Sequence, residues 1–307
     1  MSAATSVTFT ATDGSVLAGT LYQPAAGKPP SAAVLINAGA GIPATYYGRF
    51  ATWLAAAGIP VLTYDYRGIG RSRPASMRGF NASVEDWGSK DCAAALATLR
   101  LYVADTPLIV LGHSVGCFAT GFMQDPADVA ALVFVAPHTG YYGDYAPRQR
   151  PWMWLAWHAM MPVATRMVGY FPGRRFGLPD DLPRGVALEW ARRRHPDFWW
   201  NLRHADGTPD VERHAVLRQR FAAFRVAGLS VRIADDAFAT AAGEARIQGL
   251  FASVHFDHIV VEPNANKLGA IGHFGFFRSA SRDALWPIVG DWIAGRRWLP
   301  TLSKSAP

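Results

Sequence analysis

The feature that most constrains this chain is a strand-like run followed at once by a serine between two glycines. Residues 108–111 are continuously apolar, which is typical of a strand buried inside a parallel sheet. The next five residues, 112–116, read Gly-His-Ser-Val-Gly, and residues 119–123 can form a short helix. A strand–turn–helix unit this tight requires glycine on both sides of the serine, because a Cβ there would collide with the strand or helix. The sequence therefore predicts that Ser114 stands on a nucleophile elbow.

The composition is compatible with one large domain. The chain has 307 residues, of which 50% are hydrophobic and 17% charged, which suffices for an α/β core with an insertion. Cys92 and Cys117 fall in predicted helices and form no disulfide framework, which fits a reducing, cytoplasmic compartment. The sequence shows no signal-peptide pattern and no apolar run long enough to cross a membrane, so we expect neither.

The net charge of +7 raises the question of an anionic partner. Arginine clusters do occur, but Asp and Pro interrupt them and no nucleic-acid-binding motif accompanies them. We therefore expect a solvated surface and no nucleic-acid partner. The partner that the sequence favours is a small-molecule substrate.

Strand patterns on both sides of Ser114 predict a mostly parallel sheet that is covered by helices. Two alternating segments around residues 12–15 read as an antiparallel hairpin. Helical patterns then separate the remaining strand-like runs, which are residues 32–36, 61–64, 108–111, 130–135, 229–233 and 254–261. This rhythm breaks at His138 and resumes near residue 229. We therefore expect an α/β core made of residues 1–137 and 229–307, with a helical cap or lid formed by residues 138–228.

Several large apolar side chains in the predicted cap can line a pocket. They lie on one segment and are Trp152, Trp154, Trp157, Met160 and Met161. Trp154 and Trp157 are the expected substrate contacts. Such a lid favours an acyl chain or an aromatic ester over a charged peptide. The same residues are as well explained by packing of the cap onto the core.

A serine hydroxyl becomes a nucleophile only beside a base that a carboxylate orients. In a parallel sheet these groups collect at the carboxyl ends of the strands. That criterion selects His273, after the last strand, and Asp236 or Asp235, after the strand before it, with Asp236 preferred. His113 is expected to support Ser114 or to contact the substrate. The pentapeptide alone can arise by chance, but the flanking elements and these partners favour the nucleophile.

The oxyanion of an acyl-transfer reaction needs two backbone N–H donors. The amide of Val115, directly after the serine, is the first. The second should come from the small-residue run 37–41, with Gly39 preferred and Ala38 next. The site needs no metal and no cofactor for this chemistry, and we expect none.

Four motifs together resemble the α/β-hydrolase superfamily, and within it the predicted serine hydrolases of the serine aminopeptidase and monoacylglycerol lipase group. They occupy residues 65–72 (DYRGIGRS), 86–88 (DWG), 112–116 (GHSVG) and 271–278 (IGHFGFFR). The resemblance implies an eight-stranded α/β-hydrolase fold with a lid, a triad of Ser114, Asp236 and His273, and no cofactor. Asn37 and Ala38 replace the His-Gly that usually follows the third strand, which leaves the second oxyanion donor open.

These observations predict a serine esterase that cleaves a carboxylic ester through an acyl-enzyme. One alternative is an acyltransferase with the same triad, in which another acceptor replaces water. A second is a non-catalytic protein of this fold that binds a ligand. The intact Ser, Asp and His in the expected chain order favour the enzyme. The acyl length and the oligomeric state do not follow from the sequence.

Overall fold

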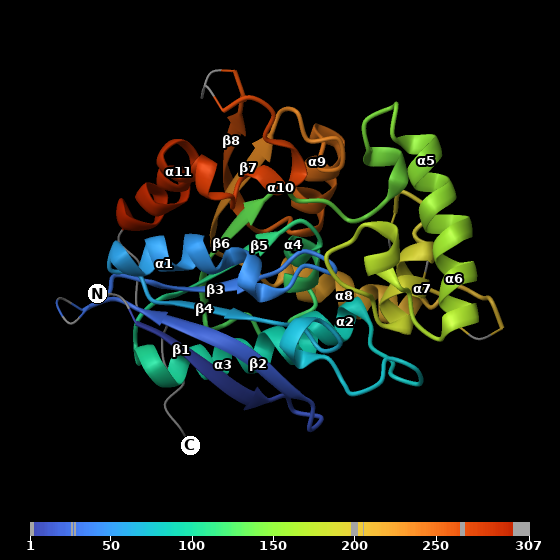
Figure 1. Ribbon diagram of the computed structural model, residues 1–307, viewed down its shortest axis with the longest axis horizontal. Coiled ribbons are helices and arrows are strands. Elements are labelled where there is room, and N and C mark those ends of the chain that lie inside the picture. Colours follow the sequence, from blue (N-terminus) through green and yellow to red (C-terminus); the bar gives the residue numbers. More distant parts are fainter. Residues whose placement is uncertain are drawn as a thin grey trace.

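A computed structural model describes residues 3–25, 27, 29–197, 202–204, 206–264 and 268–296. Its centre is an eight-stranded sheet with helices on both faces (Figure 1). The strand order is β1-β2-β4-β3-β5-β6-β7-β8. The β1–β2 and β2–β4 pairs are antiparallel and the other five pairs are parallel. The predicted fold class is thereby confirmed.

The strands lie close to the predicted ranges. They are β1 (Ala3–Thr10), β2 (Val16–Gln23), β3 (Ala33–Asn37), β4 (Val61–Tyr64), β5 (Leu108–His113), β6 (Val129–Val135), β7 (Ala227–Ile233) and β8 (His255–Val261). β3, β4 and β5 are buried along their whole length. Helices cover both faces of these central strands, which is why their sequences are almost continuously apolar.

Helices fill the connections between the strands. Before β6 they are η1 (Ala44–Tyr47), α1 (Gly48–Ala56), η2 (Gly70–Ser72), α2 (Val84–Asp86), η3 (Trp87–Cys92), α3 (Ala93–Val103) and α4 (Val115–Thr120). After β7 they are α9 (Ala241–Leu250), α10 (Gly272–Gly275), η8 (Ser279–Ser281) and α11 (Arg282–Ala294). None of the described helices is long and apolar enough to cross a membrane.

The helical segment between β4 and β5 is formed by α2, a π-helical turn (η3) and α3 in succession. Ser83 and Asp86 form a capping box that starts this run. Gly88 in the π-helical turn lies against α4, where an added Cβ would come within 2.0 Å of the carbonyl oxygen of Ala119. The close approach of these two helices therefore requires glycine at this position.

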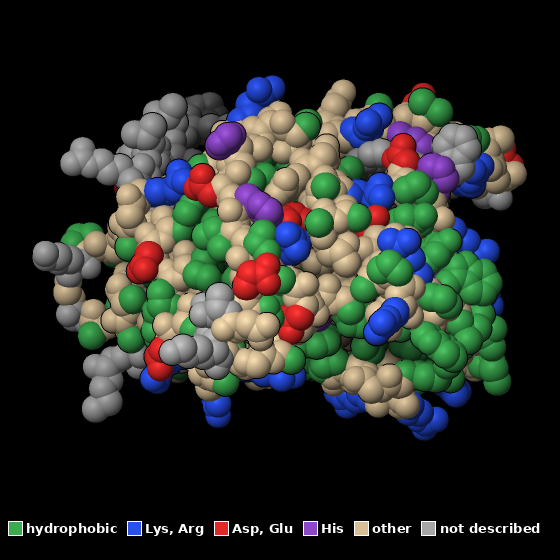
Figure 2. Space-filling model, turned by 90° about the horizontal axis from the view of Figure 1, so that it is seen from above, with side chains coloured by type: hydrophobic (Ala, Val, Ile, Leu, Met, Phe, Trp, Pro, Cys, Tyr) green, Lys and Arg blue, Asp and Glu red, His purple; other side chains and the backbone are tan. Residues whose placement is uncertain are grey.

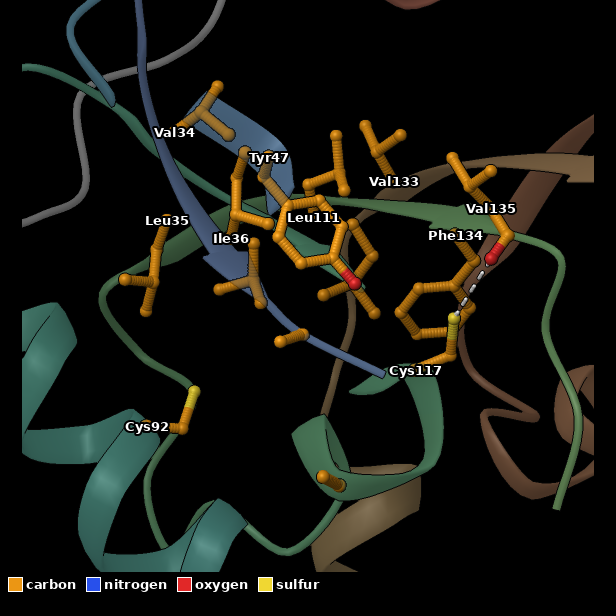
Figure 3. Packing of buried hydrophobic residues seen from close by; sticks show 14 of the residues in the cluster. Val34, Leu35, Ile36, Tyr47, Cys92, Leu111, Cys117, Val133, Phe134 and Val135 are labelled. Carbon is orange, nitrogen blue, oxygen red and sulfur yellow. Dashed lines mark hydrogen bonds between the residues drawn. The ribbon is translucent and has the colours of Figure 1, made fainter. Parts of the chain in front are cut away.

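The core beneath the site is a dense cluster of strand residues and helix residues. Figure 3 shows Val34, Ile36 and Leu111 from neighbouring strands packed near Tyr47. Cys92 and Cys117 point into this cluster, and both are free thiols buried from solvent. They act as small packing residues.

Between β6 and β7 the described chain is mainly helical. It forms η4 (Tyr142–Asp144), α5 (Arg150–Leu155), η5 (Ala156–Met160), α6 (Met161–Val168), η6 (Gly173–Phe176), α7 (Arg184–Arg192) and α8 (Val211–Ala222). α5, α6 and α7 stand to one side of the sheet (Figure 1). α8 instead packs on the core, where the ring of Phe221 contacts those of Phe118 and Phe251. We refer to α5, η5, α6, η6 and α7, with the segments that join them, as the cap.

Candidate active site

Ser114 occupies the sharp turn between β5 and α4. Its backbone has φ 57° and ψ −126°, a conformation that residues with a Cβ rarely adopt. An added Cβ would come within 2.7 Å of Cys117 N at Gly112 and within 2.3 Å of Asn37 O at Gly116. The two glycines therefore permit the strained turn that places the serine side chain at the carboxyl edge of the sheet.

Three side chains from three strand ends form a continuous hydrogen-bonded relay. The Nε2 atom of His273, in α10, lies 2.9 Å from Ser114 Oγ. Its Nδ1 atom lies 2.7 Å from Oδ2 of Asp236, in the turn after β7. Burial alone would raise the pKa of Asp236, but the hydrogen bond and charge of His273, with two backbone amides, lower that pKa below its ordinary value. The carboxylate is thus held ionised beside the imidazole.

The neighbouring aspartate has a different contact. Asp235 accepts hydrogen bonds from the backbone amides of Ile271 and Gly272, both at 2.9 Å. Asp236 therefore pairs with the side chain of His273, whereas Asp235 holds the backbone just before it. Of the two alternatives that the sequence leaves open, the structure places Asp236 against the histidine ring.

A cavity of about 650 Å³ opens onto Ser114. Ser114, His138 and His273 lie along it, and most of the remaining wall is apolar and comes from the cap, including Met153, Trp157, Met160, Met161, Phe171, Leu182 and Trp190. Arg278 is the sole Lys, Arg, Asp or Glu in the described wall. The cavity therefore suits a ligand with a large apolar part.

The comparisons with known proteins agree with this geometry. Residues 28–176 match the model of the serine aminopeptidase S33 family of hydrolases. The matched segment holds the elbow serine Ser114, and this part of the chain is similar to that family of hydrolases. A search of curated protein sequences found no match.

Solved α/β-hydrolase structures share the architecture at low sequence identity. GrgF from Penicillium sp. sh18 is 17% identical with a TM-score of 0.60, over 96% of this chain and 99% of that one. An esterase from Pyrococcus furiosus is 13% identical with a TM-score of 0.55, over 96% and 93%. A thermophilic esterase from Thermogutta terrifontis is 16% identical with a TM-score of 0.57, over 95% and 98%. At these identities the likeness shows the fold alone.

The predicted substrate contact Trp154 lies away from the cavity, as does Trp152, a predicted pocket residue. Trp154 is 44% exposed on the outer side of α5, and Trp152 is 68% exposed. They belong to an apolar surface over the cap, at the right of Figure 2, with Leu155, Val163 and Met167. The prediction for Trp154 is therefore corrected, because α5 turns its side chain outward. Trp157 does line the cavity.

His113 also lies outside the cavity wall, fully buried behind the serine. Its Nδ1 accepts a hydrogen bond from the Tyr47 hydroxyl at 2.8 Å, and its Nε2 donates to the His273 carbonyl at 3.1 Å. Burial lowers the pKa of His113 to about 3, so the ring stays neutral. The predicted substrate contact is therefore wrong, because His113 lies behind the serine and its Nε2–H holds the backbone carbonyl of His273.

The same network corrects the preferred oxyanion donor. The N–H of Gly39 donates to the hydroxyl oxygen of Tyr47 at 2.9 Å, so it is already engaged. Ala40, the next residue, lines the cavity, and no described residue accepts a hydrogen bond from its amide. Tyr47 lies in η1, which follows this loop. The contact of its hydroxyl with Gly39 therefore depends on how the loop folds and could not be predicted from the sequence.

His138, for which the sequence predicts no role in the site, lies with its Nε2 2.9 Å from Ser114 Oγ. This residue follows β6, the strand next to the elbow strand in the sheet. The carboxyl-end criterion that selects Asp236 and His273 applies equally to His138 and would have found it. It marks the point where the alternating pattern stops, which is why it reads as the start of the cap.

Proposed function

We propose that this protein is a serine esterase that cleaves a carboxylic ester with an apolar acyl or aromatic part through an acyl-enzyme. The observation that carries the proposal is the unbroken relay from Ser114 through His273 to Asp236, which opens onto an apolar cavity. The two esterases among the structural neighbours support an ester as the bond that is cleaved.

In the proposed reaction the Oγ–H bond of Ser114 breaks as His273 Nε2 takes the proton. Oγ then forms a bond to the ester carbonyl carbon, and the carbonyl π electrons move to the oxygen. The tetrahedral intermediate collapses, the alkoxy oxygen leaves with the proton from His273, and the acyl group stays on Ser114. Water repeats the sequence with His273 as base and releases the acid. Asp236 orients the ring and stabilises its charged form throughout.

Two backbone amides are proposed to hold the oxyanion. Val115 is the first residue of α4, and a helix leaves the N–H groups of its first turn without intrahelical partners. Ala40 supplies the second N–H in place of Gly39, whose amide donates to Tyr47. Val115 directly follows Ser114 in the chain, and Ala40 lines the cavity.

Apolar side chains of the cap are proposed to select the substrate. Trp157, Met160 and Met161 line the cavity opposite the relay. Burial of an acyl chain there contributes about 0.8 kcal/mol for each methylene group. Unbranched methionine side chains adapt to ligands of different shape.

The test combines a covalent probe with a substrate series. The intact protein and a Ser114→Ala variant are treated with a fluorophosphonate, and turnover of p-nitrophenyl esters from acetate to dodecanoate is followed. We expect labelling at Ser114, and turnover that rises with chain length and vanishes in the variant. A protein that is neither labelled nor active would contradict the proposal and favour a ligand-binding member of the superfamily.

A further inference from the structure

The proposed mechanism gives no role to the second histidine on the serine. His138 Nε2 lies 2.9 Å from Ser114 Oγ, as close as His273 Nε2. We propose that His138 is a second catalytic imidazole, which donates its Nε2–H to Ser114 Oγ and stabilises the negative charge that builds there. Charge builds when the O–H bond breaks in acylation and when the bond from oxygen to the acyl carbon breaks in deacylation. This inference rests on the proposed acyl-enzyme chemistry.

The hydrogen-bond partners of His138, His273 and Ser114 determine which atom of each side chain carries its proton. The backbone N–H of Gly140 donates to Nδ1 of His138 at 2.9 Å, so the proton of the neutral ring lies on Nε2. The single hydroxyl hydrogen of Ser114 points to His273 Nε2, because the Nδ1 of that ring faces the carboxylate of Asp236. The second contact at Ser114 Oγ is therefore a hydrogen bond received from His138.

This assignment separates the tasks of the two histidines. His273 faces a carboxylate and can take up a proton, whereas His138 already carries its proton on Nε2 and faces an N–H donor at Nδ1. Protonation of that Nδ1 would break its bond with Gly140. Burial, followed by the nearby charge of His273, keeps the pKa of His138 well below its ordinary value of 6.5. His138 thus stays a neutral donor while His273 carries the serine proton.

The segment that carries His138 is held in one conformation. Ala136, just after β6, has φ 51°, a strained value for a residue with a Cβ. The guanidinium of Arg193, at the end of α7, donates to the carbonyl of Thr139. Gly140 has φ 83°, and an added Cβ would lie 2.9 Å from the ring of Trp190. The fold therefore maintains strain here, as is common at functional sites.

The ring is also packed on several sides. Its centroid lies 5.8 Å from that of Tyr145, 6.3 Å from that of Trp190 and 5.3 Å from that of His273. The imidazole is 3% exposed. A phenylalanine at position 138 would keep an aromatic ring in this position and remove the Nε2–H donor, together with the Nδ1 acceptor of the Gly140 N–H. Glutamine keeps an N–H donor, so comparison of the two variants isolates the donor.

The first arm of the test measures the rate of fluorophosphonate labelling in the full chain. We expect His138→Phe to slow labelling about 10- to 100-fold, since one hydrogen bond to developing charge is lost. His138→Gln, which restores an N–H donor, should recover at least about half of that loss on a logarithmic scale. Equal thermal melting of the three proteins shows that the fold is unchanged. Labelling of the phenylalanine variant at the wild-type rate, or equal slowing of both variants, would overturn the proposal.

The second arm does not depend on activity. Nitrogen-15 NMR of the histidine rings should show His138 as a neutral Nε2–H tautomer, whose proton signal shifts in Ser114→Ala because the acceptor is removed. A proton on Nδ1, or a signal that ignores the substitution, would overturn the proposal. If the wild-type protein does not react with the probe, the proposed esterase and the catalytic part of this inference both fail. The NMR result then still decides whether His138 donates to the serine.

Discussion

The two sides of the cavity differ in their interactions: hydrogen bonds predominate at the strand ends, and apolar contacts predominate on the cap. At the strand ends Ser114, His273 and Asp236 are buried and joined by hydrogen bonds of 2.7 to 2.9 Å. On the cap the wall is apolar, and the outer side exposes Trp152 and Met167 to solvent. Hydrogen bonds depend steeply on distance and angle, whereas apolar contact depends mainly on area. A change at the strand ends should therefore decide whether the reaction occurs, and a change in the cap should decide which substrate reacts.

The largest effect should come from the two adjacent aspartates. Asp236→Asn should lower kcat about 10³- to 10⁴-fold, because an amide favours the wrong tautomer of His273. Asp235→Asn removes only a contact to the backbone before that histidine and should cost about 10-fold. Steady-state kinetics on one p-nitrophenyl ester gives both numbers. An equal fall in kcat for the two variants would contradict the separate roles of the two carboxylates, one at the imidazole ring and one at the backbone.

The next effect concerns His113, which is buried behind the serine and holds the backbone of His273. His113→Phe removes the hydrogen bonds to Tyr47 and to the carbonyl of His273, and leaves both groups buried without that partner. We expect the free energy of unfolding to fall by about 1–3 kcal/mol and kcat to fall about 10-fold. Urea unfolding and ester turnover measure the two changes. A stable variant with full kcat would contradict a positioning role.

The cap should respond in substrate preference rather than in chemistry. Trp157→Ala removes cavity wall, so kcat/KM for a long-chain ester should fall about 10-fold while that for the acetate changes little. Trp154→Ala is the matched control, since that side chain faces solvent and should leave both values unchanged. If kcat/KM fell equally for esters of all chain lengths, the cap would not act on substrate preference alone, which would contradict the comparison.

The smallest effect is a pH dependence of stability. The folded-state pKa of Asp236 lies below its ordinary value of 3.8, so ionisation of this group stabilises the fold above about pH 4. That contribution is lost as the pH falls through the lowered folded-state pKa. The stability advantage of the wild type over Asp236→Asn should therefore narrow as the pH is lowered below about 4 in thermal unfolding. An advantage that grows on acidification would contradict the ionised, paired carboxylate.

The sequence predicted those parts of the site that depend on chain order and short-range sterics. Gly112 and Gly116 mark the elbow because a tight turn excludes a Cβ on either side. The carboxyl-end rule located Asp236 and His273 to within one residue. It did not decide between Asp235 and Asp236, because a shift of one residue reverses which of them faces the histidine.

Contacts between segments that are distant in the chain could not be predicted from the sequence. The amide of Gly39 is engaged by a tyrosine hydroxyl that only the folded loop brings to it. His138 contacts the serine two residues after Ala136, which adopts a left-handed conformation that its side chain disfavours. Trp154 lies on α5 and faces outward, whereas Trp157, in the π-helical turn η5 that follows, lines the cavity. Their shared place on one segment of the sequence could not distinguish these two orientations.

The most direct test of the acyl-enzyme is the mass of the protein during turnover. A p-nitrophenyl ester is mixed with the enzyme, the reaction is stopped in acid within its burst, and the intact protein and its peptides are weighed. The account predicts one added acyl group, located on the peptide that contains Ser114 and absent from Ser114→Ala. Turnover with no added mass, or an acyl group on another residue, would contradict it.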